Sequence, residues 1–434
     1  MGAAFYPPLL KRWMVWLVEF SLPLFYRGLL GGFQVRFDPA SFQAWQKILH
    51  EQRHRRVLFL PNHPTEDDPF VMFDLARQMR VPFHYVAARE VFDLEGGLRG
   101  KLFQRVGVYS LIRGATDRES FRTTRRILAE GETPLVIFIE GEISYQNGHL
   151  IPFESGVLQL AYMAQEAVLK EVTAKTTEPK PTPFGLEDIL VAPVALKYQC
   201  LENPEKYIEQ GLLGLEMALS IPTDIQNSDS RYYRLRRIAA AILTIQEEQL
   251  NIPVTAKSHT EQNTEDSDIL DERMLRVKNA LLNRMERYLD IVPESHAEEP
   301  MLDRLRRIRN TIDIRTHHYT EKPLPTLYQQ HLIQHEARTF KEFYRDLDRV
   351  VSFLIFKDGY VREKPTPERF MEMIFRLEKE VFGRPKTQVP RQANVTLGNP
   401  VSLLAHYAAY QQDKRGTLTQ LTQVLEKDMQ RLID

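Results

Sequence analysis

The fold of this chain is decided by residues 57–69, which read Val57-Leu58-Phe59-Leu60-Pro61-Asn62-His63-Pro64-Thr65-Glu66-Asp67-Asp68-Pro69. The apolar start predicts a buried strand, and the apolar residues after Pro69 predict a helix. A strand-to-helix turn displays side chains at the rim of a sheet, where the sites of α/β folds lie. In this turn His63 precedes Asp68 by five residues, and such a pair can serve as a general base with an orienting carboxylate.

A purely structural interpretation of this turn competes with the functional one. Asp68 before Pro69 suits the N-cap of a helix with proline in its first turn. His63 would then be an ordinary loop histidine. The motifs that follow along the chain favour the functional interpretation, because they occur in a defined order.

Four motifs in a fixed order carry a resemblance to a known family. They are Asn62-His63-Pro64-Thr65-Glu66-Asp67-Asp68, a basic stretch with Arg89, Gly107 and Arg113, then Phe138-Ile139-Glu140-Gly141-Glu142-Ile143-Ser144, and Val191-Ala192-Pro193-Val194-Ala195-Leu196. Over residues 57–198 the chain resembles the glycerolipid acyltransferase family, which includes lysophosphatidic-acid and glycerol-3-phosphate acyltransferases. The resemblance implies a mixed sheet flanked by helices.

The resemblance also implies a reaction in phospholipid synthesis or remodelling. A fatty acyl chain would pass from acyl-CoA or acyl-carrier protein to a hydroxyl of a lysophospholipid of the 1-acyl-glycerol-3-phosphate type. His63 would take the proton and Asp68 would orient it. The acceptor would be bound by Arg89, Arg113, Glu140 and Gly141. No metal and no cofactor beyond the acyl donor is implied.

The third motif departs from the family pattern and leaves other functions open. Ile139, Glu142 and Ile143 replace the family's proline, threonine and arginine, and the family's arginine helps to bind the acceptor phosphate. The acceptor head group is therefore undecided. A non-catalytic membrane-associated scaffold on the same fold and a hydrolase of acyl thioesters are the alternatives. Glu66 and Asp67 with His63 also allow a divalent-metal site, although no other histidine has matching ligand spacing.

A basic helix is predicted after the second motif. Thr116-Asp117-Arg118-Glu119 has the pattern of a capping box, and Gly131 marks the helix end. Arg118, Arg122 and Arg125 share one face at helical spacing. They would attract an anionic membrane surface or the phosphates of an acyl donor. A plain solvated face is the alternative, and nucleic acid is disfavoured because no binding motif accompanies the charge.

The N-terminal residues 1–32 suit a membrane interface. Their apolar run between Arg12 and Arg27 would span only ~21 Å as a helix, less than the ~30 Å hydrocarbon core. Tryptophans and flanking cations favour a helix in the headgroup region, on the cytoplasmic face of a membrane, as a peripheral or monotopic protein. The alternative is an amphipathic helix packed on the protein itself.

Composition and the pattern of apolar residues divide the 434 residues into three parts. Net charge is −1, and a single cysteine, Cys200, excludes an intrachain disulfide. We expect an acyltransferase domain at 33–200 and an all-helical C-terminal domain at 201–434, with a mobile linker at about 255–268. The expected helices are 231–250, 269–291, 301–314, 327–356, 367–382 and 400–433. The helical domain is a candidate for binding a protein partner.

Overall fold

The structure is a computed structural model. It describes residues 5–28, 31–51, 54–93, 97–113, 117–175, 182–222, 231–253, 267–292, 299–318, 326–355 and 358–434. The chain divides into two compact units, the first formed by Met1–Gln199 with Arg391–Asp434 and the second by Cys200–Pro390. Each unit is described by itself below.

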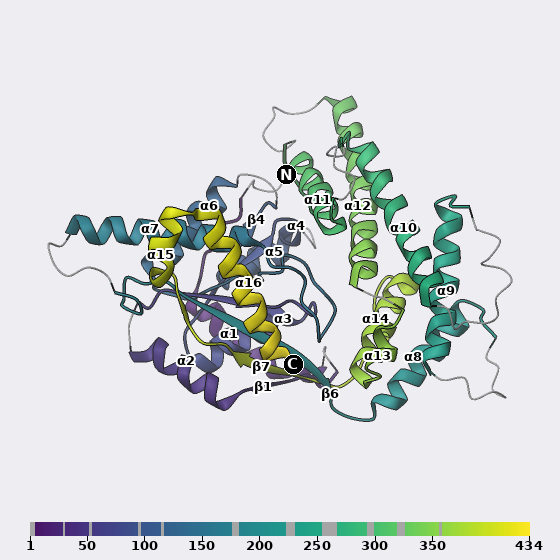
Figure 1. Ribbon diagram of the computed structural model, residues 1–434, viewed down its shortest axis with the longest axis horizontal. Helices are drawn as coiled ribbons and strands as arrows, with labels where there is room; N and C mark the ends of the chain where they lie inside the picture. Colours follow the sequence, from purple (N-terminus) through teal and green to yellow (C-terminus); the bar gives the residue numbers. More distant parts are fainter. Residues whose placement is uncertain are drawn as a thin grey trace. The chain divides into compact units, whose positions relative to one another are not determined.

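An eight-stranded sheet forms the centre of the first unit (Figure 1). Its strands are β1 (Gln34–Phe37), β2 (Val57–Pro61), β3 (His84–Ala88), β4 (Val108–Leu111), β5 (Leu135–Val136), β6 (Leu190–Cys200), β7 (Arg391–Leu397) and β8 (Val401–Ser402). The strand order is β1-β7-β6-β2-β5-β3-β4, and β8 pairs antiparallel with β6. Strand β2 is parallel to both of its neighbours, with Leu58 opposite Leu135 and Val191. Burial on both faces explains why β2 is continuously apolar.

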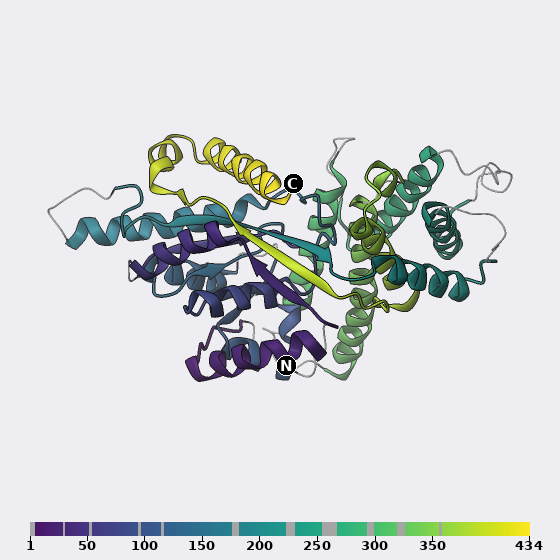
Figure 2. The same ribbon diagram turned by 90° about the horizontal axis from the view of Figure 1, so that it is seen from below.

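Helices cover both faces of this sheet. One face carries α2 (Pro39–Glu51), α3 (Asp68–Met79) and, packed on α3, α1 (Arg12–Gly28). The other carries α6 (Arg118–Glu130), α7 (Ser155–Lys175) and α16 (Lys414–Ile433). Figure 2 shows the purple N-terminal helix and the yellow α16 on opposite sides of the sheet. The short helices are α4 (Glu90–Asp93), α5 (Leu98–Arg105), α15 (Tyr407–Gln412) and the 3-10 turn Leu404–His406.

The structure confirms the expected α/β class and corrects the expected domain boundary. Residues 391–434 belong to the first unit, not to a helical domain, because β7 lies in the sheet between β1 and β6. The expected helix 400–433 is in fact β8, the 3-10 turn, α15 and α16. The missed strand β7 pairs with residues more than 190 positions away, as in the register of Ala393 with Val35. Local periodicity carries no information about such a partner.

All described elements of the second unit are helices. They are α8 (Pro204–Ala218), α9 (Arg231–Gln249), α10 (Ser267–Tyr288), α11 (Met301–His318), α12 (Leu327–Ile355), α13 (Tyr360–Glu363) and α14 (Pro367–Phe382). The sequence predicted α9 to α12 and α14, and it missed α8 and the short α13. The expected linker at about 255–268 lies almost wholly outside the described residues.

Helix α1 has two apolar faces. Val15, Leu22 and Tyr26 are buried against the unit, as the alternative of a helix packed on the protein requires. Trp16 and Phe20 on the outer face are 64% and 69% exposed. Within the described ranges, no helix combines the length and apolar character needed to cross a bilayer.

Candidate active site

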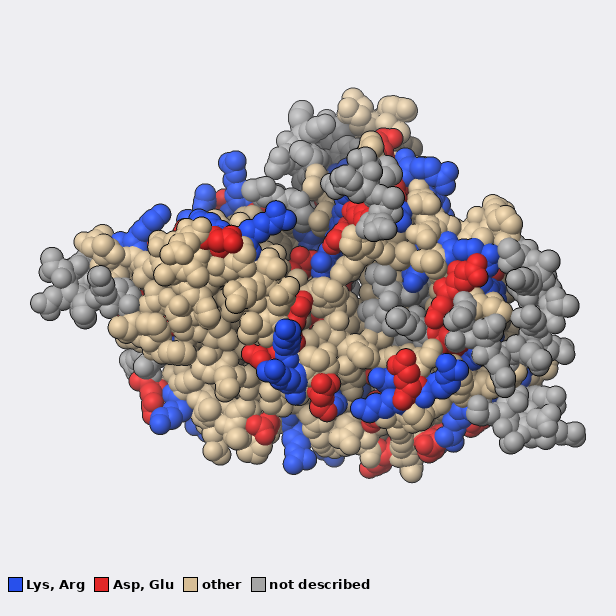
Figure 3. Space-filling model, in the orientation of Figure 1, with Lys and Arg blue, Asp and Glu red and all other residues tan. Residues whose placement is uncertain are grey.

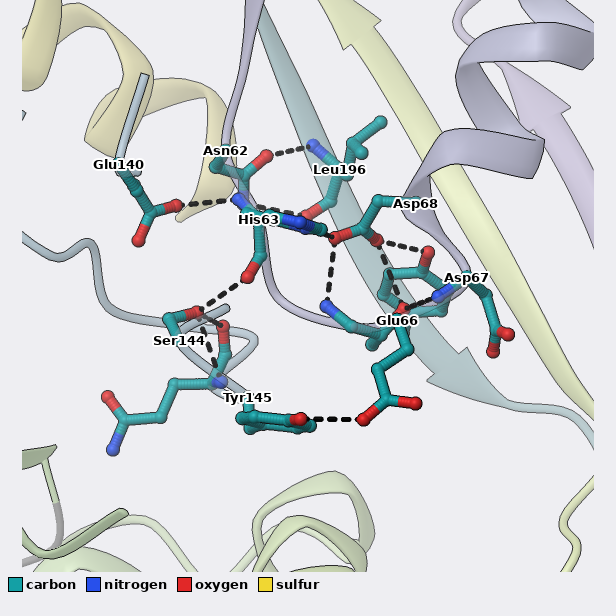
Figure 4. A network of polar contacts seen from close by, with 12 residues as sticks. Asn62, His63, Glu66, Asp67, Asp68, Glu140, Ser144, Tyr145 and Leu196 are labelled. Carbon is teal, nitrogen blue, oxygen red and sulfur yellow. Dashed lines mark hydrogen bonds and ion pairs between the residues drawn. The ribbon is translucent and has the colours of Figure 1, made fainter. Parts of the chain in front are cut away.

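His63 and Asp68 meet at the carboxyl end of β2 (Figure 4). His63 Nδ1 lies 2.7 Å from Asp68 Oδ2. The Asp68 side chain is fully buried, and the His63 side chain is 15% exposed. If Nδ1–H donates to the carboxylate, the lone pair of Nε2 is the one that can accept a proton. The pair is therefore arranged as a general base with its orienting acid.

The carboxylate of Asp68 is held by three further donors. The backbone N–H of Thr65 donates to Oδ2 at 2.9 Å, and its hydroxyl donates to Oδ1 at 3.1 Å. The Tyr198 hydroxyl, from β6, donates to Oδ1 at 2.5 Å. Burial, with the nearby Asp68 charge, raises the pKa of Tyr198 well above its ordinary value, so the phenol stays a donor. Four donors compensate the burial of this carboxylate.

The N-cap interpretation of Asp68 is wrong. Asp68 is the first residue of α3, and the N-cap position is taken by Asp67, which makes no side-chain cap bond. The carboxylate of Asp68 turns back toward His63 and Thr65 instead. Pro69 does lie in the first turn of α3, where its missing N–H is tolerated.

The backbone of His63 is clamped by the third motif. Its N–H donates to Glu140 Oε1 at 2.7 Å (Figure 4), and its carbonyl accepts from the Ser144 N–H at 2.8 Å. The Phe138 ring stacks on the imidazole with centroids 4.1 Å apart. Asn62 exchanges two side-chain hydrogen bonds with the backbone of Leu196, which ties the end of β2 to β6. The Asn and Glu of the motifs thus position the histidine.

Glu140 is fully buried, and both of its oxygens accept backbone hydrogen bonds. Oε2 accepts from the Ile151 N–H at 2.9 Å, while Oε1 is used by His63. Burial raises the pKa of Glu140 to about 8, and the two backbone donors oppose this shift. These contacts support a positioning role. The predicted contact of Glu140 with the acceptor stays a prediction.

Gly141 lies in a tight turn after β5 with φ of 72°, a conformation that favours glycine. A Cβ atom at this position would lie 3.2 Å from Cγ of Glu154. The structure therefore explains the glycine by the turn, and its predicted approach to the acceptor stays a prediction.

The two predicted phosphate-binding arginines have intramolecular neighbours. Arg113, just beyond β4, forms ion pairs with Glu90 and, at 3.7 Å, with Glu142 of the third motif. Arg89 is 2% exposed, and its guanidinium lies 4.2 Å from the centre of the Tyr6 ring. An anionic acceptor would have to compete with Glu90 and Glu142 for Arg113.

Comparison with known proteins shows to which family one segment of the chain is similar. Residues 46–197, about a third of the chain, match the family model described as Acyltransferase. This segment is an acyltransferase domain. The resemblance seen in the four motifs is confirmed, and the fold agrees with it. No curated protein matches the chain.

The acyltransferase domain is completed by residues outside the matched range. Arg391, the first residue of β7, forms an ion pair with Asp67, next to Asp68. Its guanidinium lies 5.3 Å from the centre of the Tyr198 ring and 5.8 Å from that of Phe33. No local sequence pattern marks Arg391 as a residue of the site. Tyr198 could have been found, because it continues the alternation of β6 two residues beyond the fourth motif.

The acidic residues of the metal alternative have other contacts. Asp67 pairs with Arg391, and Glu66 Oε1 accepts from the Tyr145 hydroxyl at 2.7 Å. In the part of the chain that the structure describes, no group of three or more His, Cys, Asp or Glu side chains is arranged to hold a metal ion.

Proposed function

We propose that this acyltransferase moves a fatty acyl chain from a thioester donor, acyl-CoA or acyl-carrier protein, to a hydroxyl of a lysophospholipid. The observation that carries the proposal is the His63–Asp68 pair, with its 2.7 Å contact, in an acyltransferase domain. The simplest acceptor to test is 1-acyl-glycerol 3-phosphate.

The geometry supports direct transfer without an acyl-enzyme. Nε2 of His63 takes the proton of the acceptor hydroxyl as its oxygen attacks the thioester carbonyl carbon. The C–O bond forms and the C–S bond breaks. The proton then passes from the imidazolium to the departing thiolate, which leaves as a thiol. Asp68 orients the imidazole and stabilises its positive charge during the step. The scheme does not use Cys200, the last residue of β6.

We propose further that the enzyme works as a peripheral protein at a lipid surface. The outer face of α1 exposes Trp13, Trp16, Leu17, Phe20 and Leu24. Lys11, Arg12 and Arg27, all exposed, lie at the two ends of the helix. Tryptophans with flanking cations suit the headgroup region of an anionic bilayer. The Tyr26 hydroxyl donates to the Phe70 carbonyl in the first turn of α3, which couples α1 to the helix that carries Asp68.

Acyl transfer in mixed micelles tests the proposal. Labelled long-chain acyl-CoA and acyl-carrier protein are each offered with 1-acyl-glycerol 3-phosphate, and then with zwitterionic lysophospholipids. Wild type should form diacyl product, and His63→Ala should lower kcat by about 10³-fold or more, in the range for losing a general base. Free fatty acid without any acceptor would identify a hydrolase. No product from any pair of substrates would favour the scaffold.

A further inference from the structure

The solvent face of α6 carries four arginines that the proposed mechanism does not use. Arg118, Arg122, Arg125 and Arg126 are all exposed, and at about 100° per residue they fall within an arc of roughly 100° around the helix. Figure 3 shows Lys and Arg side chains gathered over the part of the first unit where Figure 1 places α6. Glu119 and Glu130 lie at the border of this arc. We call the four arginines the α6 basic face.

The α6 basic face begins beside the active-site edge of the sheet. Strand β4 ends at Leu111, and the Asp117 side chain caps α6 by accepting from the Ser120 N–H at 3.0 Å and also from the Ile112 N–H at 3.1 Å. Arg113, between them, pairs with Glu142 of the motif that clamps His63. A ligand bound along α6 would therefore have one end at the same edge of the sheet as His63 and Asp68.

This face points away from the proposed lipid surface. Helix α6 packs in the hydrophobic cluster on one side of the sheet, through Ile127 and Leu128. Helix α1 packs in the cluster on the opposite side, through Val15 and Leu22. Their outer faces look in opposite directions, as Figure 2 shows for the two sides of the sheet. If α1 rests on a membrane, the arginines face the aqueous side, where a soluble donor arrives.

We propose that the α6 basic face is the docking surface for an acidic acyl-carrier protein. Arginines at positions 118 to 125 extend for about 10 Å along an exposed helix. Sites for small ligands are concave and bury most of the ligand, whereas a convex stripe of one charge matches the acidic helix of a protein partner. The carrier would dock its acidic helix here and extend its phosphopantetheine arm toward His63. This inference rests on the proposed function, since it presupposes a thioester donor.

A charge reversal on the face tests the inference. Arg122→Glu/Arg125→Glu should raise KM for acyl-carrier protein about tenfold, because like charges replace complementary ones. Its kcat, and its KM for acyl-CoA, should stay within about twofold of wild type. The matched control is Lys427→Glu/Arg431→Glu on α16, where both residues are exposed and Arg431 pairs with Asp428 as Arg122 pairs with Glu119. The control should leave both KM values unchanged.

Binding of holo acyl-carrier protein, without an acyl group, gives a readout independent of turnover. Fluorescence anisotropy should show binding by wild type and by the control, weakening with added salt, and about tenfold weaker binding by the double variant. Thermal melting checks that the double variant is folded. The neutral variant Arg122→Gln/Arg125→Gln should lose an intermediate amount of carrier binding.

The outcomes separate this inference from the proposed function. Transfer from acyl-CoA by a wild type that does not bind the carrier overturns the inference and leaves the function standing. Carrier binding that the double variant loses, without product from any donor, supports the surface and contradicts the function. Loss of liposome binding in place of carrier binding identifies a membrane surface and overturns the inference. An equal loss of carrier binding in the α16 control also overturns the inference.

Discussion

The hydroxyl of Tyr198 donates a 2.5 Å hydrogen bond to Oδ1 of Asp68, across 130 positions of the chain. The other oxygen, Oδ2, is taken by His63 and by the Thr65 backbone. The turn before α3 thus contacts both oxygens of the carboxylate through Thr65, and β6 adds the Tyr198 contact to Oδ1. Rotation of the carboxylate would break one set of contacts, so the direction in which it holds the imidazole is fixed.

Removal of this phenol should lower both activity and stability. In Tyr198→Phe the buried carboxylate loses one of four donors, and we expect kcat to fall about tenfold, an order typical of outer hydrogen bonds that orient a functional group. The free energy of unfolding should fall by about 1–2 kcal/mol. Steady-state kinetics and urea denaturation measure the two effects.

Tyr109→Phe is the matched control. Tyr109 is fully buried, and its hydroxyl bonds to Thr124 Oγ1 at 2.6 Å, away from His63. It should lose a similar amount of stability and keep its kcat. Equal kcat losses in the two variants would contradict a role of Tyr198 in orienting Asp68.

Glu142 should select against acceptors with an exposed phosphate. Its carboxylate lies 3.7 Å from Arg113, where the family has a neutral threonine. In Glu142→Thr we expect KM for 1-acyl-glycerol 3-phosphate to fall about threefold to tenfold, in keeping with the removal of one partly exposed like charge. KM for a zwitterionic lysophospholipid should change less. Glu166→Thr, which removes a carboxylate paired with Lys414 on another surface, is the control. Equal changes for both acceptors would refute electrostatic selection.

The outer face of α1 should determine lipid binding. Trp16 and Phe20 stack on each other with centroids 5.7 Å apart, and both are exposed. Trp16→Asp/Phe20→Asp should weaken liposome sedimentation at least about tenfold, because each aromatic ring buries apolar area worth about 1.5–3 kcal/mol. The melting temperature should hardly change. Val424→Asp, an exposed apolar position on α16, should bind liposomes as wild type does. Wild-type binding by the α1 variant would exclude this helix as the contact.

Burial of Glu140 should make stability depend on pH. Its pKa is about 8 in the folded protein against 4.5 for an ordinary glutamate. Between these values the unfolded chain has lost the proton and the folded chain keeps it. Raising the pH through this window therefore lowers the free energy of unfolding, and the loss is complete above about pH 8.

Glu140→Gln provides the comparison, because glutamine does not titrate. Urea denaturation of both proteins from pH 5 to 9 should show a difference in stability that changes between pH 5 and 8 and then levels off. The variant should also be less stable by about 1–3 kcal/mol at its best pH, since an amide nitrogen cannot accept the second backbone N–H. Parallel curves would mean that the carboxylate stays charged throughout, held by its two backbone donors.

Local chemistry determined a large part of this protein from the sequence alone. The turn from β2 to α3, the course of α6 up to Gly131 and the five correctly placed helices of the second unit follow from apolar periodicity and capping residues. Each depends on neighbours within a few positions, so the sequence carries the information in one window. Each motif that identified the acyltransferase family is likewise a short stretch, while their order extends over residues 57–198, and His63 and Asp68 were paired by their five-residue spacing.

Only the tertiary structure decided which distant residues surround that pair. Tyr198 and Arg391 reach the site because β6 and β7 lie beside β2 in the sheet, with no local signal for Arg391 at all. The pairing of Arg113 with Glu142 and the clamp of Glu140 on His63 likewise join separate strands. Strand order in a sheet is set by the packing of the whole core, and contacts across it therefore cannot be read from any single stretch of chain.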